Sequence, residues 1–248
     1  MDLSSPEFWL AVGQIIMIDI LLGGDNAVVI ALACRKLPAA QRRLGILWGT
    51  AGAVVLRVVL IMFALTLLKV PFLKLVGALL LLWIGIKLLM PEDEDEHANI
   101  QSSDKLWSAV KTVIVADFVM SVDNVIGIAG AAQTSGHDGH HMPLVIFGLL
   151  VSIPIIVWGS QIVLGLMTRY PFIVTLGAML LGWIAGTMAV TDPAIVAYLP
   201  LDAEASKPDR PEVEALVRYG AGALCALLVL AVGKVVASRQ KPVDYPIK

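Results

Sequence analysis

The chain has 248 residues, of which 58% are hydrophobic and only 15% are charged. A soluble domain carries about 25% charged residues, so this composition argues against a soluble protein. The formal net charge of −2 gives no indication of a nucleic-acid partner.

Long apolar runs follow one another along the chain, each near the ~20 residues that a helix needs to cross a bilayer. The first run lacks a basic n-region and a small-residue cleavage site, so we expect a membrane span rather than a signal peptide. The pattern predicts an all-α polytopic membrane protein with seven transmembrane helices. The predicted spans are Phe8–Ala33, Leu44–Leu68, Phe72–Met90, Trp107–Ala132, Pro143–Met167, Phe172–Val190 and Glu214–Val236.

The distribution of basic residues predicts the orientation of these spans. An external N-terminus and a cytoplasmic C-terminus place twelve Lys and Arg residues in cytoplasmic segments and five in external ones. We therefore expect this orientation, in the inner (plasma) membrane of the cell. Residues 91–106 then form a cytoplasmic linker, and residues 191–213 form an external loop. The acidic run of the linker is interpreted as a solvated segment or as a patch that attracts cations.

The chain contains an internal repeat. Two Asp-x5-Asp-Asn motifs carry it, Asp19-x5-Asp25-Asn26 and Asp117-x5-Asp123-Asn124. The segment PFLKLVGALLLLWI at residues 71–84 also recurs as PFIVTLGAMLLGWI at residues 171–184. Each copy spans three helices, an odd number, so the second copy enters the membrane from the opposite side. We therefore expect two inverted-topology repeats, residues 8–90 and 107–190, with a seventh helix at residues 214–237 outside them.

The four motif aspartates lie well inside predicted spans, where each costs about 2.5–3.5 kcal/mol on the insertion scale. Arg57 could neutralise one of them as a structural counterion or act as a moving gate. The other three aspartates require a bound cation, protons or both to neutralise their charge. The predicted metal ligands are Asp19, Asp25, Asn26, Asp117, Asp123 and Asn124. The alternative is that these side chains only hold helices together by hydrogen bonds.

The ligand types select the ion. Carboxylate, amide and carbonyl oxygens suit Mn²⁺, Ca²⁺ and Mg²⁺, and the predicted spans contain no histidine. Cys34 and Cys225 form no CxxC pair, which argues against a disulfide framework or a thiolate metal site. Met17 and Met120 lie near the motifs, as packing residues or as thioethers that would favour Mn²⁺. The segment His137–Met142 is interpreted as a flexible external loop or a weak metal site.

The local sequence also bears on how each motif approaches an ion. Six residues apart in a regular helix, two aspartates lie about 9 Å apart along the axis and on different faces. Gly23 and Gly24 predict a helix break that would bring the first pair together. The second motif has Ser121 and Val122 at that position, where a break is less strongly indicated.

The stretch DILLGGDNAVVIA at residues 19–31, with DFVMSVDNVIGIA at residues 117–129, resembles the TerC family of membrane proteins. The resemblance extends from about residue 8 to residue 190. It implies a seven-helix protein, manganese efflux as in several family members, and kinship with LysE-type exporters. The motif acids and asparagines of the family fall here on the six predicted ligands. Larger relatives carry additional soluble domains, and we expect this chain to be the membrane core alone.

These observations predict a divalent-cation transporter, most specifically an Mn²⁺ exporter coupled to proton entry. Exporting two positive charges against ~100 mV costs about 4.6 kcal/mol, and the sequence has no P-loop for ATP hydrolysis. The partners would be Mn²⁺ or Ca²⁺, protons and the bilayer, with no resident cofactor; homo-oligomerisation is left open. The alternatives are a facilitator for Ca²⁺ or other cations, and a membrane partner of the secretion machinery that supports metallation of exported proteins. We expect no enzymatic activity, because HExxH, GxGD-type protease and nucleophile-triad patterns are absent.

Overall fold

The computed structural model describes residues 9, 13, 17, 25–63, 70–90, 102–134, 141–202 and 212–239, and within α5 and α6 it describes few side chains between residues 123 and 152. These residues form a helical protein, with one isolated bridge between Leu201 and Val213. The helices are a segment Asp25–Cys34, α2 (Ala39–Met62), α4 (Leu73–Leu89), α5 (Ser102–Thr134), α6 (His141–Arg169), α7 (Phe172–Ala189), α8 (Pro193–Val196) and α9 (Ala215–Arg239).

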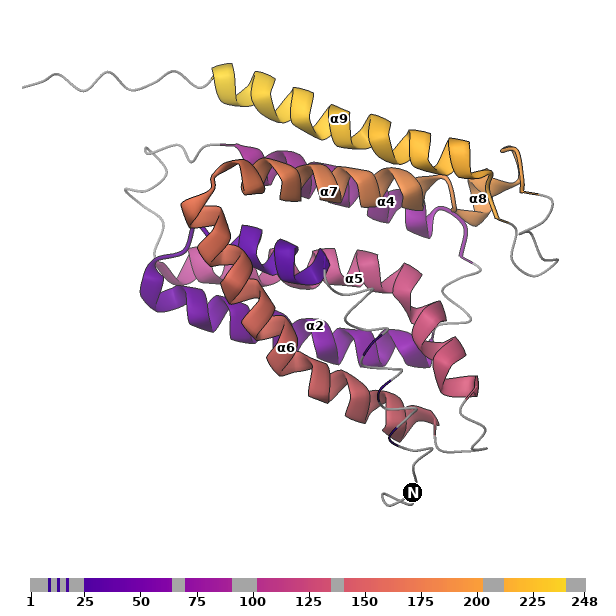
Figure 1. Cartoon of the computed structure of the whole chain (residues 1–248), viewed down its shortest axis with the longest axis horizontal. Helices are drawn as coiled ribbons and strands as arrows, with labels where there is room; N and C mark the ends of the chain where they lie inside the picture. Colours follow the sequence, from indigo (N-terminus) through magenta and orange to yellow (C-terminus); the bar gives the residue numbers. More distant parts are fainter. Residues whose placement is uncertain are drawn as a thin grey trace, which may run out of the picture.

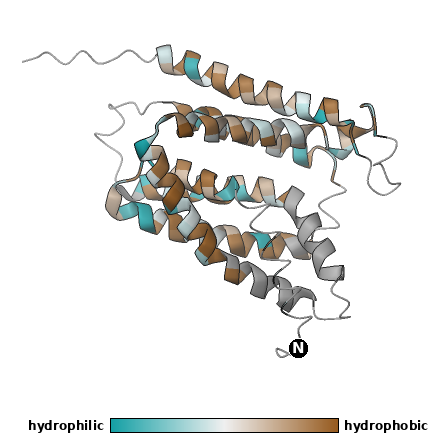
Figure 2. Ribbon diagram, viewed as in Figure 1, coloured by the Kyte–Doolittle hydropathy of each residue, from teal (hydrophilic) through white to brown (hydrophobic). Residues whose placement is uncertain are grey.

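Within the described ranges, three helical stretches are long and apolar enough to cross a membrane: Ala39–Leu60, Phe172–Ala189 and Ala215–Ser238. Figure 2 shows apolar residues along most of the length of these helices. Large apolar side chains of these helices, such as Trp48, Leu176 and Leu224, are exposed, as expected for surfaces in contact with lipid. The prediction of an all-α membrane protein is therefore confirmed.

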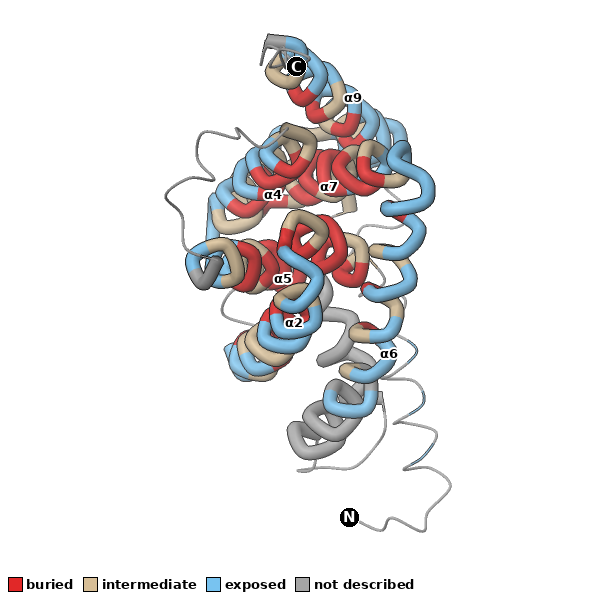
Figure 3. The backbone as a smooth tube through the Cα atoms, turned by 90° about the vertical axis from the view of Figure 1, so that its left-hand side faces the viewer, coloured by how far each residue is buried: buried red, intermediate tan, exposed pale blue. Residues whose placement is uncertain are grey.

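The helices lie in two layers (Figure 1). One layer contains α4, α7 and α9, and the other contains α2, α5, α6 and the segment Asp25–Cys34. The buried faces of α4, α5 and α7 are turned toward one another in Figure 3. The apolar core between the layers is formed by Val29, Leu32, Leu81, Ile84, Val119, Met120, Leu181, Ala185 and Met188, among others. The segment that carries the first motif thus packs into the same core as the helix that carries the second.

A buried aspartate ties the start of α4 to the end of α7. The Asp192 carboxylate accepts hydrogen bonds from the backbone N–H groups of Phe72 (2.9 Å), Leu75 (3.1 Å) and Ala194 (2.8 Å). It therefore caps α8 and satisfies amides in the first turn of α4, which have no partner within that helix. Phe72 has a φ of 65°, the left-handed backbone that turns the chain into α4. Because the start of α4 meets the end of α7, the two helices are antiparallel.

The repeated glycines lie against the opposite repeat. A Cβ at Gly77 of α4 would lie 2.7 Å from Val119 Cγ1 of α5. A Cβ at Gly177 of α7 would lie 2.9 Å from Val28 Cγ1 of the segment Asp25–Cys34. Each third helix of a repeat therefore packs closely on the first helix of the other.

Several predicted boundaries need correction. The helix α5 begins at Ser102, inside the predicted linker, and α9 extends to Arg239. The predicted external loop 191–213 contains α8 and the Leu201–Val213 bridge, because Asp192 nucleates a short helix there. The other predicted linker residues, 91–101, lie outside the described part of the chain.

The second motif lies on an unbroken helix. α5 continues from Ser102 to Thr134, through Ser121 and Val122, since neither residue interrupts helical hydrogen bonding as proline would. The predicted break at Gly23 and Gly24 falls outside the described residues.

Candidate cation site

The site lies beside the packed pair α2 and α5. The buried positions of α2 include Ile46, Thr50, Ala53, Arg57 and Leu60, which are spaced three or four residues apart on one face. Glycine lets this face approach α5 closely, because a Cβ at Gly49 would meet three atoms of Val113 at 3.0–3.3 Å. This close approach brings a cationic side chain into an otherwise mainly apolar interface.

That cation is paired with the first acid of the second motif. The Nη2 of Arg57 lies 2.8 Å from Asp117 Oδ1, and both side chains are almost fully buried. Ser121, one helical turn after Asp117, donates its hydroxyl to Asp117 Oδ2 at 3.1 Å and accepts a hydrogen bond from Arg57 Nε at 3.1 Å. The three side chains thus form a closed triangle of hydrogen bonds. Such a pair is tolerated in the membrane because each charge satisfies the other.

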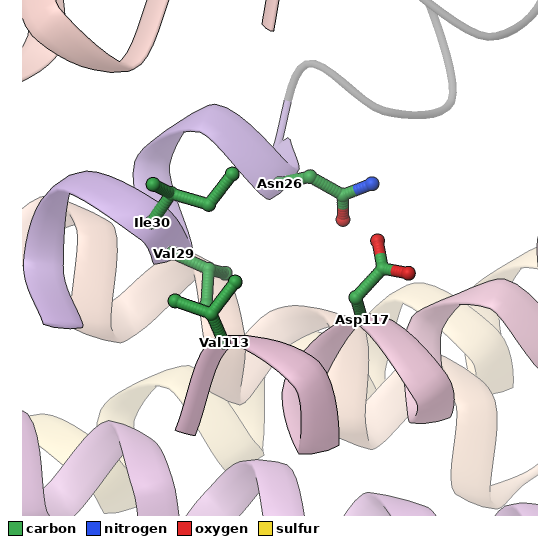
Figure 4. Close-up of a pocket in the computed structure, with 5 residues that line it drawn as sticks. All are labelled: Asn26, Val29, Ile30, Val113 and Asp117. Atoms are coloured by element: carbon green, nitrogen blue, oxygen red, sulfur yellow. The ribbon is translucent and has the colours of Figure 1, made fainter. Parts of the chain in front are cut away.

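A small cavity opens beside Asp117 (Figure 4). It is lined by Asn26, Val29, Ile30, Val113 and Asp117 and has room for about one water molecule or a single ion. Figure 4 shows the side-chain amide of Asn26 and the carboxylate of Asp117 pointing toward each other across it. Two oxygen-bearing groups that face each other between apolar walls could together contact a small cation.

Asn26 is the unusual member of this cavity. It is only 4% exposed, yet neither its amide nitrogen nor its amide oxygen has a hydrogen-bond partner among the described residues. A buried polar group without a partner costs about 1–3 kcal/mol, so such a group needs a physical explanation. A ligand that enters the cavity would supply the missing contact.

The predicted ligands are only partly brought together. Asn26 and Asp117 face one cavity, and Asp25 lies beside them, half-buried, with its Oδ1 accepting the backbone N–H of Asn26 at 3.0 Å. Asp19 lies outside the described residues. Asp123 and Asn124 lie on α5, but their side chains are not described. Among the described side chains, no three or more His, Cys, Asp or Glu residues gather as a metal site.

Other predicted features fall as follows. Met120 packs in the core between the layers, which agrees with its interpretation as a packing residue. The Met17 side chain is 56% exposed. His141 and Met142 belong to α6, so the predicted loop is shorter than expected, and its residues 137–140 lie outside the described part.

The sequence analysis missed two polar residues of the described structure, Ser121 and Asp192. Ser121 could have been found, since a position four residues after Asp117 lies on the same helix face. Asp192 gave no such indication, because its partners lie about 120 residues earlier in the chain.

Comparison with known proteins agrees with the motif resemblance. The family model described as "Integral membrane protein TerC family" matches residues 4–241. The chain is 39% identical over 193 residues to the "Uncharacterized membrane protein YjbE" of Bacillus subtilis, covering 78% of this chain and 85% of that protein. It is 23% identical over 185 residues to the "UPF0053 inner membrane protein YgdQ" of Escherichia coli K12, covering 68% and 75%. No solved structure matches the chain. The chain therefore belongs to the TerC family of integral membrane proteins.

Proposed function

We propose that this protein exports a hard divalent cation, most specifically Mn²⁺, through a site between its two repeats. The observation that carries the proposal is the buried amide of Asn26, which faces the Asp117 carboxylate across a cavity and has no partner among the described residues. Amide and carboxylate oxygens are the ligands that Mn²⁺, Ca²⁺ and Mg²⁺ prefer. Asp25, Asp19, Asp123 and Asn124 would complete the ligand set as the ion passes.

The packing of the helices supports an inverted-repeat transporter with seven spans. The corresponding helices α4 and α7 are antiparallel, and their matching glycines Gly77 and Gly177 each contact the motif helix of the other repeat. A two-fold axis in the membrane plane would produce this arrangement, in which the third helix of each repeat packs on the first helix of the other. In such transporters the ion site lies where the repeats meet, near the midplane, and access alternates around it.

Proton entry would supply the free energy that Mn²⁺ export requires. Exporting one Mn²⁺ against ~100 mV costs about 4.6 kcal/mol, and exchange for two protons cancels the charge moved. Aspartates that bind either metal or protons could perform this exchange, because both are cations that neutralise the same carboxylates.

The proposed orientation places the N-terminus outside, in the inner membrane. Arg35 and Lys36 donate hydrogen bonds to the carbonyl oxygens of Leu88 (3.1 Å) and Met90 (2.9 Å) at the end of α4. These cations also interact favourably with the helix C-terminus. The positive-inside tendency makes this end cytoplasmic and the Asp192 end external.

The test is Mn²⁺ flux in proteoliposomes that contain a pH-sensitive dye. We expect wild-type protein to move Mn²⁺ with opposite proton movement and Asn26→Ala to lose at least about 90% of the flux, since the amide is a direct ligand. The control is Asp104→Asn, which removes an exposed carboxylate from the first turn of α5 and should leave the flux unchanged.

The outcomes separate the alternatives. Mn²⁺ flux without proton movement at any membrane potential would remove the antiport step. Flux that does not saturate and is not accelerated by Mn²⁺ on the other side would indicate a facilitator. No divalent-cation flux at all would contradict the transporter proposal and favour a role in metallating secreted proteins.

A further inference from the structure

The Arg57–Asp117 pair has properties that helix packing alone does not require. The interface of α2 and α5 is built by close contact of glycines with Val113 and Ile114, and its other buried positions are apolar or neutral. A charge there is costly unless it is compensated, and replacing such a pair by apolar residues is often neutral or stabilising. The pair therefore calls for an explanation at the site next to it.

Both oxygens of Asp117 are engaged in the structure. Arg57 binds Oδ1, and the Ser121 hydroxyl binds Oδ2. On the opposite side of the cavity, the Asn26 amide has neither of its hydrogen-bonding atoms satisfied by the described residues. Both Asp117 oxygens thus have hydrogen-bond partners, whereas the amide that faces them has none among the described residues.

We propose that Arg57 is an internal counterion that occupies Asp117 in the unloaded site and competes with the transported cation for that carboxylate. This inference rests on the proposed function and adds to it a residue that sets the affinity for the transported ion. A divalent ion in the cavity would take lone pairs of Asp117 and repel the guanidinium only a few ångströms away. Arg57 would then shift its hydrogen bonds away from the carboxylate.

Arginine suits this role because its side chain does not lose its proton in proteins. It can leave Asp117 only by moving, so the positive charge stays in the interface throughout the cycle. The Asp117 carboxylate then remains neutralised whenever no metal is bound, which lowers the cost of burying its charge in the membrane. The strength of the Arg57–Asp117 pair would set how tightly the ion is held.

The experiment measures Mn²⁺ binding to the purified full-length protein by the loss of the free-Mn²⁺ electron paramagnetic resonance signal. Arg57→Gln should bind Mn²⁺ at least about tenfold more tightly than wild type, because a close competing charge is removed. Arg57→Lys, which keeps the charge, should stay within about threefold of wild type. Ser121→Ala should tighten binding by about threefold, because it loosens the Arg57–Asp117 contact without removing a charge. Lys111→Gln, an exposed position on α5, is the matched control and should not change binding.

A stability measurement distinguishes this role from a purely structural one. Arg57→Gln leaves Asp117 uncompensated, so its melting temperature without metal should fall, and Mn²⁺ should restore more of it than Mn²⁺ adds to wild type. Unchanged or weaker Mn²⁺ binding in Arg57→Gln, with no such restoration, would overturn the inference. If Arg57→Gln does not fold, unchanged or weaker binding in Ser121→Ala would overturn it. Wild-type protein that binds no Mn²⁺ would instead remove the proposed function, and this inference with it.

Discussion

At the scale of single residues, Asn26 and Ser160 show two ways of burying a polar side chain. The Ser160 hydroxyl is fully buried and donates to the carbonyl oxygen of Ile156 at 2.6 Å, one turn earlier on its own helix. The Asn26 amide is almost as buried but finds no such partner in the described structure. Stability alone would favour an apolar side chain at position 26, because a buried amide without a partner is destabilising. We therefore expect that Asn26 is kept for its function.

Replacing Asn26 by leucine tests whether its buried amide is kept for ion binding. Asn26→Leu should leave the free energy of unfolding unchanged or raise it by about 1 kcal/mol, because it removes an unsatisfied buried amide. The same substitution should abolish Mn²⁺ binding. Thermal unfolding in detergent and Mn²⁺ titration measure the two effects on one preparation.

Ser160→Ala is the control for this variant. Its hydroxyl lies outside the cavity, so Mn²⁺ binding should stay at the wild-type level. A stabilised Asn26→Leu protein that still binds Mn²⁺ would show that the amide is not a ligand.

At the scale of helices, two contacts position the site. Gly49 and Gly52 of α2 lie against α5 and set the distance between the two helices. This distance in turn determines how closely the Arg57 guanidinium approaches the Asp117 carboxylate. Asp192 fixes the start of α4 against the end of α7, using backbone N–H groups from two helices. The first contact acts directly on the site, whereas the second holds the layer on which it packs.

Gly49→Val tests the first contact. The added side chain meets Val113, which is branched at Cβ and cannot easily turn away, so overpacking should lower the free energy of unfolding by about 1–3 kcal/mol. By separating α2 from α5 it should also alter Mn²⁺ binding. Thermal unfolding and Mn²⁺ titration check both.

Gly165→Val on α6 is the matched control. A Cβ at Gly165 has no atom within 4 Å in the described part of the chain, so the change in stability should stay within about 0.5 kcal/mol. Equal destabilisation of the two variants would mean that helix propensity, rather than the α2–α5 contact, governs the effect.

Asp192→Ala tests the second contact. Loss of a carboxylate that accepts three backbone N–H groups should lower the free energy of unfolding by about 3 kcal/mol. Asp192→Asn, which keeps one acceptor oxygen, should lose less. Thermal unfolding in detergent ranks the variants.

The exposed Asp104 provides the comparison, because Asp104→Ala removes only a favourable charge near a helix N-terminus, worth less than about 1 kcal/mol. If Asp192→Ala and Asp104→Ala lose the same stability, Asp192 does not hold α4 against α7.

At the scale of the whole molecule, the proposed orientation in the membrane can be followed along α4. This helix has 17 residues and is about 25 Å long, so in the proposed seven-span arrangement its two ends would lie near opposite surfaces of the hydrocarbon core. Arg35 and Lys36 lie at its C-terminal end, and Asp192 and α8 lie at its N-terminal end. The proposed orientation therefore places the residues at these two ends of α4 on opposite sides of the membrane.

Cysteine labelling tests the orientation. In a variant whose Cys34 and Cys225 are replaced, Tyr198→Cys, at a position 88% exposed after α8, should react with an impermeant maleimide added to intact cells. Ala40→Cys, at an exposed position near the start of α2, should react only after permeabilisation. The opposite labelling pattern would reverse the orientation that the positive-inside tendency predicts.

The sequence by itself determined the class of the protein, its family and the approximate positions of its apolar helices. Length and hydropathy of a run fix whether a helix can span a bilayer, because the backbone satisfies its own hydrogen bonds within each helix. The repeated Asp-Asn motifs also predicted Asn26 and Asp117 as ligands of one site, and both residues line the same cavity in the structure. Hydropathy and the repeated motifs can be read from one segment or from the comparison of two segments, without knowledge of how the helices pack.

Which polar side chains contact one another depends on how the helices pack in the folded protein. Arg57 could be proposed as a counterion, but its choice of Asp117 depends on how closely α2 approaches α5. The unsatisfied state of Asn26 depends on the helices around it, and the role of Asp192 depends on the antiparallel contact of α4 and α7. Hydrogen bonds and charge pairs between helices act over a few ångströms, so they are fixed by packing rather than by local sequence.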